Sequence, residues 1–437
     1  MGPLVRQLVL KWLSKRSPWS PVIFLILLGA IVAVLPGHRG WFDVGVYHGA
    51  VNFWVHEGGQ LYNYVRPDST YGFTYPPFAA LAMLPMAAVA WHPTIAVNAA
   101  LTLAAGLFLV WTLAGPVVRR MGLPRVYGLG TAVVFFGALG PVRDTILFGQ
   151  INLLLMALVY LDLALFNSRY HRFAGIGIGL AAAIKLTPGI FIVYLLLTRR
   201  WRAAVISATT ALSATVLAAI IMPDATRTYF TELLWDTSRI GDLAYVSNQS
   251  LLGLVSRHSE GGRWFWLCLA LLVLTIWGYR VRRADLLTGF AMTGLVACLV
   301  SPITWVHHLV WLAPGLILLA QKESTRRLAI TCYVLLVSCL VWLWSLDHTG
   351  PLGFLGANAY VFVSLVMFVA LAFPSWVRVP SMAPVAWQLQ PAWEGPRATS
   401  RPPQPVRPRV IYSPHHPASQ WMPTIQVLAS AHARHLR

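Results

Sequence analysis

Asp43 is the residue whose position best suits chemistry at a membrane surface. It lies in the run WFDVGVYH at residues 41–48, a few residues after the uncharged apolar stretch 18–36. A carboxylate held there could reach a lipid-linked substrate and act as the general base that takes the proton of an attacking hydroxyl. Inverting transfer of a sugar needs such a base on the face opposite the departing phosphate. The alternative is that Asp43 is an ordinary solvated loop residue.

Cationic and imidazole side chains in apolar sequence are the second feature. Lys185 interrupts an apolar stretch, and an unpaired charge at that depth is costly enough that it usually faces a cavity. Arg143 and the adjacent His307 and His308 lie at the ends of other apolar stretches. We expect these four side chains to bind the phosphate of a lipid-linked donor. The alternatives are that Lys185 snorkels or pairs with a carboxylate, that Arg143 pairs with Asp144, and that the histidines are structural.

Aromatic and amide side chains near these positions suit sugar binding. Rings stack on sugar faces, and amides exchange hydrogen bonds with hydroxyls. Taken singly, each ring is also typical of the belt at a water–lipid boundary. We assign these residues to sugar or acceptor binding: Tyr47, His48, Tyr75, Gln150, Asn152, Asn248 and Gln249.

The composition excludes a soluble globular protein. Of the 437 residues, 57% are hydrophobic and only 11% are charged, against about a quarter charged in a soluble domain. The net charge of +19 does not indicate nucleic acid, because the basic residues form short clusters between apolar runs. All four cysteines fall in apolar stretches, so neither a disulfide framework nor a metal site is predicted.

The chemistry-bearing residues must be positioned by membrane helices. Apolar runs of the length that crosses a bilayer recur along the chain and predict an all-α polytopic protein with roughly ten to twelve transmembrane helices. With the N-terminus in the cytoplasm, the basic clusters fall on the cytoplasmic side, as the positive-inside rule requires. The predicted spans are 20–36, 94–117, 126–142, 145–166, 203–222, 263–279, 286–300, 309–320, 328–346 and 358–373.

Two apolar pieces do not fit as simple crossings. Residues 76–91 are short, and one crossing there would invert every later loop, so a partial insertion or half of a hairpin is expected. Residues 173–198 have arginines on both sides and are broken at the sequence KLTP, which predicts two half-length helices that meet within the membrane. Irregular backbone at that depth is tolerated only where it is buried or lines a cavity.

The chain divides into three predicted parts. Residues 1–19 form a cytoplasmic N-terminal segment, and residues 20–374 form the transmembrane catalytic module with large outer loops at 37–75 and 224–262. Residues 375–437 are Pro-rich and basic without an apolar period, which predicts a disordered cytoplasmic tail. With this topology ten of the fourteen acidic residues face outward, so carboxylate chemistry is expected on the extracytoplasmic side.

Six short motifs follow one another between residues 42 and 308: FDVGVY, YPP, GQIN, KLTP, NQS and SPITWVHH. Their order resembles glycosyltransferase family 87, which comprises actinobacterial membrane mannosyltransferases of the GT-C architecture. The resemblance covers about residues 40–373. Within the family the chain is most similar to mycobacterial α-(1→2)-mannosyltransferases that act in the synthesis of lipomannan, lipoarabinomannan and phosphatidylinositol mannosides.

This resemblance implies a polyprenyl-phosphate-mannose donor, a mannoside glycolipid acceptor and an inverting transfer at the outer face of the plasma membrane. It also implies an outer-loop aspartate as base, which corresponds to Asp43, and short interfacial helices in the outer loops. No cofactor, nucleotide or nucleic acid is expected. The competing class is a transporter or flippase for a lipid-linked sugar, which would also need a cavity with polar intramembrane residues. Inverted repeats would favour that class, and none is found in the sequence.

Overall fold

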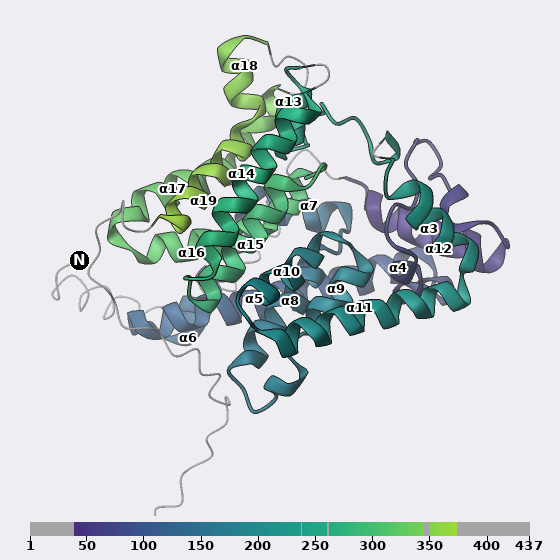
Figure 1. The fold of residues 1–437 in the computed structure, drawn as a ribbon, viewed down its shortest axis with the longest axis horizontal. Helices are drawn as coiled ribbons and strands as arrows, with labels where there is room; N and C mark the ends of the chain where they lie inside the picture. Colours follow the sequence, from purple (N-terminus) through teal and green to yellow (C-terminus); the bar gives the residue numbers. More distant parts are fainter. Residues whose placement is uncertain (1–38, 237, 260–261, 345–348, 374–437) are drawn as a thin grey trace, which may run out of the picture. The chain divides into compact units, whose positions relative to one another are not determined.

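The computed structural model describes residues 39–236, 238–259, 262–344 and 349–373 (Figure 1). These residues are mainly helical and include no β-strand. Val65 and Gly72 form one isolated antiparallel bridge. The predicted all-α class is therefore confirmed. The segment 1–19, the predicted first span 20–36 and the tail 375–437 lie outside the described residues.

The helices follow one another along the chain in two halves. The first half holds α3 (Phe42–His56), η1 (Leu61–Asn63), α4 (Pro77–Ala82), η2 (Leu84–Ala88), α5 (Trp91–Met121), α6 (Arg125–Ala138), α7 (Gly140–Phe148), α8 (Asn152–Phe166), η3 (His171–Phe173), α9 (Ile176–Ile184), η4 (Thr187–Gly189), α10 (Ile190–Leu197) and α11 (Trp201–Ile221). The second half holds α12 (Pro223–Thr228), η5 (Tyr229–Leu233), η6 (Ser238–Ile240), α13 (Leu251–Ser256), α14 (Arg263–Val281), α15 (Leu286–Val300), η7 (Val306–Leu312), α16 (Ala313–Gln321), α17 (Glu323–Ser338), η8 (Leu340–Trp344), α18 (Gly350–Ala357) and α19 (Ala359–Ala372).

Long straight crossings are fewer than the sequence predicts. Within the described residues α5, α11 and α14 are each long and apolar enough to cross a membrane. Two bent pairs pass the same test together, α6 with α7 at 74° and α18 with α19 at 61°. The other apolar helices are shorter, so several predicted spans are short or bent helices. The bend after α6 has a local cause, because Pro141 near the start of α7 cannot continue the hydrogen bonding of the preceding helix.

The centre of the molecule is built around α15. Twelve residues of this helix are buried, and it packs against α10, α14, α16, α19 and η7. Peripheral α11 and α14 instead expose large apolar side chains, such as Ile220 at 74% and Leu271 at 61% exposed. Apolar faces of this extent are suited to lipid and not to water. The chain is thus a multi-pass membrane protein.

The predicted interruption in 173–198 is confirmed. The helix α9 ends at Ile184, and Lys185 has the extended conformation, with φ −148° and ψ 128°. Pro188 then starts a short turn before α10. The two half-length helices pack against α8, α11 and α15, and α15 also contacts the turn η4 between them.

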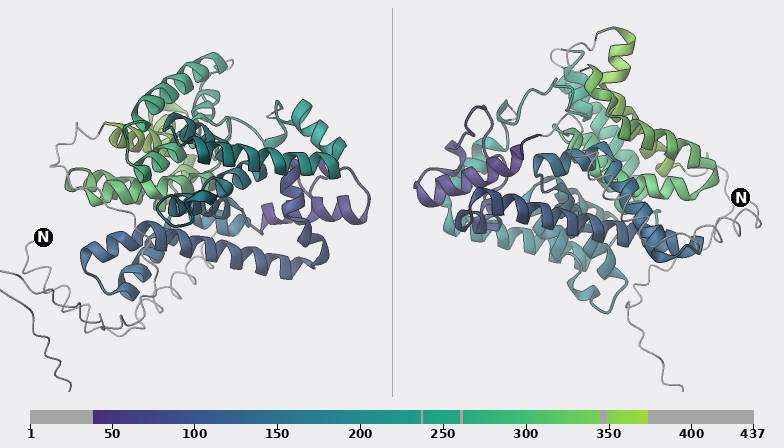
Figure 2. Two further views of the ribbon diagram at one scale, coloured as in Figure 1. Left: turned by 60° about the horizontal axis from the view of Figure 1, so that its bottom comes forward. Right: turned by 180° about the vertical axis from the view of Figure 1, so that it is seen from behind.

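Two segments that are far apart in sequence lie side by side. Figures 1 and 2 show α3, in the segment 37–75, next to α12, at the start of the segment 224–262. Tyr62 stacks on Tyr229 with ring centroids 6.0 Å apart, and Arg239 donates to the Tyr62 carbonyl oxygen at 2.7 Å. The two predicted outer loops, 37–75 and 224–262, are therefore joined, and short helices occur in both.

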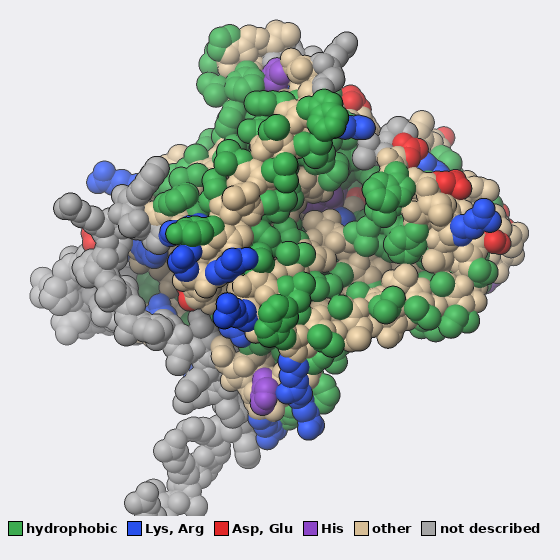
Figure 3. Space-filling model, in the orientation of Figure 1, with side chains coloured by type: hydrophobic (Ala, Val, Ile, Leu, Met, Phe, Trp, Pro, Cys, Tyr) green, Lys and Arg blue, Asp and Glu red, His purple; other side chains and the backbone are tan. Residues whose placement is uncertain are grey.

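Basic residues gather at other helix ends. Arg120, at the end of α5, donates to Gln321 at the end of α16 at 3.1 Å. Arg200 lies over the Phe166 ring at the end of α8, and Arg280 lies over Phe373 after α19. Figure 3 shows several Lys and Arg side chains close together on the face it presents. Each of these contacts joins the ends of two separate helices.

Candidate active site

Asp43 is held in place by the start of α3. The preceding Trp41 has a left-handed conformation with φ 52°, and its N–H donates to the Leu147 carbonyl oxygen at 3.3 Å. The end of α7 approaches closely, because a Cβ at Gly149 would lie 2.6 Å from the Val44 side chain. Asp43 thus occupies the first turn of α3, where the helix dipole favours a carboxylate, next to the chain that follows α7.

The carboxyl group of Asp43 is only partly satisfied. Its Oδ2 atom is buried and has no hydrogen-bond partner. Burial raises the pKa of Asp43 from its ordinary 3.8 to about 7, although Gln150, Lys185 and Arg66 act in the opposite direction. The group lies in α3, outside the helices that qualify as membrane spans. A carboxyl with a pKa near neutrality is well matched to general-base work.

Arg66 is a functional candidate that the sequence analysis missed. Its guanidinium donates to the Phe42 carbonyl oxygen and lies 4.5 Å from the centre of the Phe42 ring. It therefore braces the residue next to Asp43 and contributes positive charge near the carboxylate. The sequence signal was a lone arginine within a run of aromatic residues.

A hydrogen-bonded network connects Asp43, which has a side-chain hydrogen bond with Gln150, to Lys185. The Tyr75 hydroxyl donates to Gln150 Oε1 at 3.0 Å and lies 2.9 Å from the Tyr47 hydroxyl. Lys185 Nζ lies 3.4 Å from the same Tyr75 hydroxyl. Four of the predicted residues from separate motifs are thus in contact.

Lys185 is the centre of this network. Its ammonium donates to Asn152 Oδ1 at 3.2 Å, and it lies 2.9 Å from His308 Nε2. It also lies 5.0 Å from the centre of the Tyr75 ring. The break between α9 and α10 explains this reach, because the side chain leaves extended backbone and not a helix face.

His308 is oriented by its own turn. The Trp305 N–H donates to His308 Nδ1 at 3.1 Å, which leaves Nε2 directed at Lys185. In a neutral imidazole whose Nδ1 accepts, the ring proton is on Nε2. Two donors, the Lys185 ammonium and the His308 Nε2–H, then face the same small space.

Seven of the predicted site residues meet in this network. It contains Asp43, Tyr47, Tyr75, Gln150, Asn152, Lys185 and His308. Figure 3 shows a recess in the middle of its face, within which basic, acidic and histidine side chains are visible. Among the described residues no group of three or more His, Cys, Asp or Glu could hold a metal ion.

Five predicted residues have side chains outside this network, and His48, Arg143 and His307 are three of them. His48 Nε2 bonds the Val89 carbonyl at 3.1 Å, and its ring packs on Trp91. Arg143 donates to the Val337 carbonyl oxygen at 2.9 Å and contacts Cys339 Sγ. His307 is adjacent to His308, but its ring is turned by 84° and its Nε2 has no partner.

The side chains of Asn248 and Gln249 form hydrogen bonds with backbone groups. Asn248 donates to the carbonyl oxygens of Leu243 and Pro302 and accepts from the Thr304 N–H. Gln249 donates to the Val246 and Ala357 carbonyl oxygens and accepts two N–H groups at the start of α19. Both side chains are fully buried. These hydrogen bonds therefore hold the segment 224–262 against the neighbouring helices.

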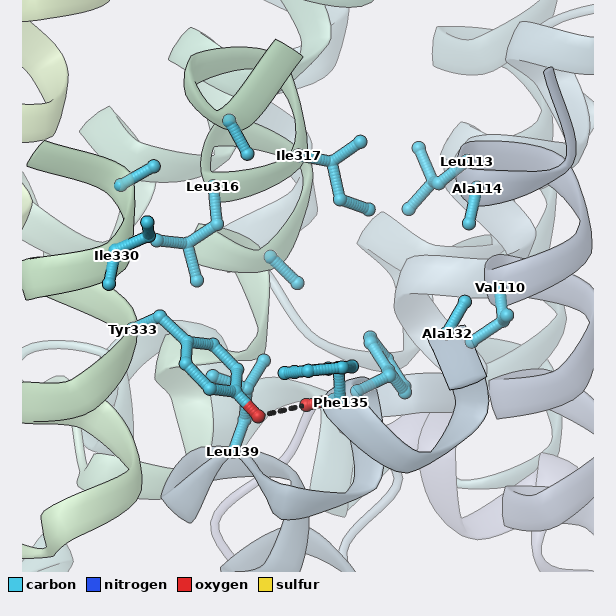
Figure 4. Close-up of a pocket in the computed structure, with 14 residues that line it drawn as sticks. Val110, Leu113, Ala114, Ala132, Phe135, Leu139, Leu316, Ile317, Ile330 and Tyr333 are labelled. Atoms are coloured by element: carbon cyan, nitrogen blue, oxygen red, sulfur yellow. Dashed lines mark hydrogen bonds between the residues drawn. The ribbon is translucent and has the colours of Figure 1, made fainter. Parts of the chain in front are cut away.

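An apolar pocket of about 290 Å³ lies elsewhere, between α5, α6, α16 and α17 (Figure 4). Tyr333 is the single polar side chain among the fourteen that line it, and its hydroxyl donates to the Phe135 carbonyl oxygen at 3.0 Å. Its walls suit hydrocarbon and offer no group for sugar or phosphate chemistry. The polar network around Asp43 and Lys185 is the candidate active site.

Comparison with known proteins shows which proteins this chain is similar to. The model of glycosyltransferase family 87 matches residues 73–302. A polyprenol-phosphate-mannose-dependent α-(1-2)-phosphatidylinositol pentamannoside mannosyltransferase of Mycobacterium tuberculosis is 34% identical over 71% of this chain and 74% of the relative. Its Mycolicibacterium smegmatis counterpart is 34% identical over 69% and 75%. An M. tuberculosis α-(1-2)-phosphatidylinositol mannoside mannosyltransferase is 29% identical over 76% and 83%. No solved structure matches.

Proposed function

The chain belongs to glycosyltransferase family 87, and from that premise we propose that the network around Asp43 and Lys185 is where it transfers mannose. The protein is a polyprenyl-phosphate-mannose-dependent mannosyltransferase whose acceptor is a mannoside glycolipid. Its relatives are named for phosphatidylinositol mannosides, so we propose an acceptor of that class and an α-(1→2) linkage.

Asp43 acts as the general base in this proposal. As the acceptor oxygen attacks the anomeric carbon of the donor mannose, Asp43 takes the hydroxyl proton. The bond between the anomeric carbon and the phosphate oxygen breaks, and its electron pair leaves with the polyprenyl phosphate. Phosphate is a good leaving group and needs no general acid, which fits a site with one free carboxylate oxygen.

Lys185 and His308 hold the donor phosphate. Two hydrogen-bond donors that face each other at 2.9 Å repel unless an acceptor satisfies both. An anionic phosphate oxygen that lies beside the pair, at hydrogen-bond distance from both nitrogens, would accept from each and stabilise the charge that develops on the leaving group. Asn152 and Tyr75 fix the Lys185 ammonium from the other side.

The observation that carries the proposal is the unpartnered Oδ2 of Asp43, joined by one network to the Lys185 ammonium. A base and an anion site on opposite sides of a sugar are the two groups that inverting transfer from a lipid phosphate requires. The test supplies purified protein with a polyprenyl-phosphate carrying radiolabelled mannose and with a mannoside acceptor. Label in a product with one added mannose is expected, and labelled donor left intact would overturn the proposal.

A transporter or flippase is the competing function. Membership of a glycosyltransferase family favours transfer, and the free base beside the phosphate site has no role in translocation. The same labelled donor in proteoliposomes separates the two. Movement of intact donor between leaflets without acceptor-dependent product would favour the transporter.

We place the active site on the extracytoplasmic side of the plasma membrane. Asp43 belongs to a segment that packs against residues 224–262, and the basic helix ends contact one another elsewhere. Basic ends are typical of the cytoplasmic face. Cysteine introduced at exposed Glu57 should react in intact cells with a maleimide that cannot cross membranes, whereas cysteine introduced at exposed Arg172 should not.

A further inference from the structure

A second group of buried polar atoms lies beside the active site and has no role in the reaction described above. Asp144 Oδ2, His307 Nε2 and the Tyr360 hydroxyl are buried without hydrogen-bond partners. All three residues are at most 7% exposed. Unsatisfied buried polar atoms are costly, and several in one place indicate groups that a ligand satisfies.

Two arginines complete this group. Arg39 and Arg143 both lie close enough to Asp144 to act on its charge. The Arg39 guanidinium lies 4.7 Å from the Trp342 ring centre and 5.4 Å from that of Phe148. Asp144 and Arg143 are close enough to act on the Tyr360 hydroxyl, and Arg39 is close enough to act on His307. We call Arg39, Arg143, Asp144, His307, Trp342 and Tyr360 the Asp144 cluster.

The Asp144 cluster shares its supporting segments with the active site. Arg39 precedes Asp43 by four residues, Asp144 precedes Gln150 by six, and His307 is next to His308. The rings of His307 and Phe148 are 5.3 Å apart, and the Asn152 amide donates to the His307 carbonyl oxygen at 3.1 Å. Each of these three segments therefore supplies one residue to the Asp144 cluster and one to the active site. The shared segments fix the cluster and the active site relative to each other.

Aromatic rings form a rim from the active site to this cluster. The ring of Phe42, beside Asp43, lies 5.7 Å from that of Tyr71. Tyr71 and Trp305 both lie within 3.4 Å of the Cβ position of Gly241. Tyr245 then lies 6.2 Å from Trp305 and 6.3 Å from Trp342. Tyr71 and Tyr245 are exposed and the other three rings are half-buried, so the row offers ring faces suited to stacking on successive sugars.

We propose that the Asp144 cluster is a second sugar subsite, which holds the mannosyl residue that precedes the acceptor residue at Asp43. The inference rests on the proposed function, since it assumes a mannoside acceptor. A sugar hydroxyl can donate to the free Asp144 oxygen and accept from Arg39 or His307, while its ring packs on the aromatic rim. A phosphate is the other ligand that two arginines can bind, but the Asp144 carboxylate would repel it.

The experiment compares two acceptors, an alkyl α-mannoside and the α-(1→2)-mannobioside with the same alkyl chain. Wild-type protein should have a KM at least tenfold lower for the mannobioside. Asp144→Asn should raise the mannobioside KM about tenfold, the loss expected for one hydrogen bond to a charged group, and leave kcat, the donor KM and the mannoside KM unchanged. Asp224→Asn removes an exposed carboxylate of the other segment and should change neither acceptor's KM.

Arg39→Gln provides the same comparison if Asp144→Asn does not fold. Equal KM values of the two acceptors for the wild-type protein would overturn the subsite, and so would a variant effect of equal size on both. A mannobioside KM that falls in Asp144→Asn would also overturn it, because the carboxylate would then oppose binding of the sugar. Failure of the wild-type protein to mannosylate either acceptor would contradict the proposed function itself.

Discussion

Lys185 Nζ and His308 Nε2 lie 2.9 Å apart, although they come from the break between α9 and α10 and from the turn η7. The Trp305 N–H at Nδ1 directs the His308 ring toward Lys185, so both groups present donors to the same space. This pair therefore defines where an anionic donor group binds.

Lys185→Met should weaken donor binding more than acceptor binding. The substitution keeps the apolar stem and removes the charge, and one charge-assisted contact with phosphate corresponds to about tenfold or more in affinity. The measurement is the KM for donor and acceptor together with direct donor binding. Lys322→Met removes an exposed lysine at the basic helix ends and serves as the control. Unchanged donor affinity in Lys185→Met would remove Lys185 from the site.

Asp43→Asn should lower turnover by about 10²- to 10⁴-fold, which is the usual contribution of a positioned base. Asparagine has nearly the same size, so the helix start and the contact with Gln150 can persist. The measurement is kcat with saturating donor and acceptor, together with donor affinity, which should change little. Near-normal turnover of a folded Asp43→Asn protein would show that another group takes the proton.

The raised pKa of Asp43 predicts a pH dependence. A general base works only when it is deprotonated, and burial raises the pKa of this group to about 7. The value of kcat/KM should therefore fall about tenfold for each pH unit well below 7 and level off above it. The residual activity of Asp43→Asn should lack this acidic limb. A wild-type profile that stays flat down to pH 5 would contradict the assignment.

The sequence was informative where a residue type was out of place. The sequence KLTP in an apolar stretch predicted the break after α9, which the structure has, and the carboxylate just after the first apolar run was the reason to select Asp43. Both predictions depend on the cost of charge near lipid, which acts locally and can be read from the chain.

Two pairs of adjacent residues show that the sequence could not predict side-chain orientations or hydrogen-bond partners. His307 and His308 looked equivalent, yet their rings are 84° apart, and only His308 contacts Lys185. Asn248 and Gln249 looked like sugar ligands, whereas the structure uses them to satisfy backbone groups. Buried irregular backbone needs such partners, and which side chains supply them depends on tertiary contacts.

Gln249→Ala should reduce stability without a selective effect on substrate binding. The substitution leaves two buried carbonyl oxygens and two N–H groups of Tyr360 and Val361 without their side-chain partner. Each unsatisfied buried group costs roughly 1–3 kcal/mol. The melting temperature in detergent should fall clearly. A normal melting temperature with a raised acceptor KM would instead support a role in sugar binding.

Truncation after Arg378 should leave catalysis intact. The last described helix, α19, ends at Ala372, and Tyr360, Val361 and Met367 pack it into the core upstream of the cut. The sequence beyond Arg378 is rich in proline and arginine and has no apolar period from which a further helix of the module could be built. Its arginines can contribute at most a salt-dependent attraction to anionic lipid, about 1 kcal/mol per charge near the surface.

The measurement is kcat and both KM values of the truncated chain, normalised to the folded fraction in detergent. Truncation after Val361 is the matched control, because it removes Met367 and the rest of the buried end of α19 and should abolish folding. If the chain ending at Arg378 folds normally but loses activity, the residues beyond it must contact the catalytic module or recruit a partner. If the truncated chain has unchanged kinetics but associates more weakly than the full chain with anionic vesicles at low salt, these arginines bind the membrane surface.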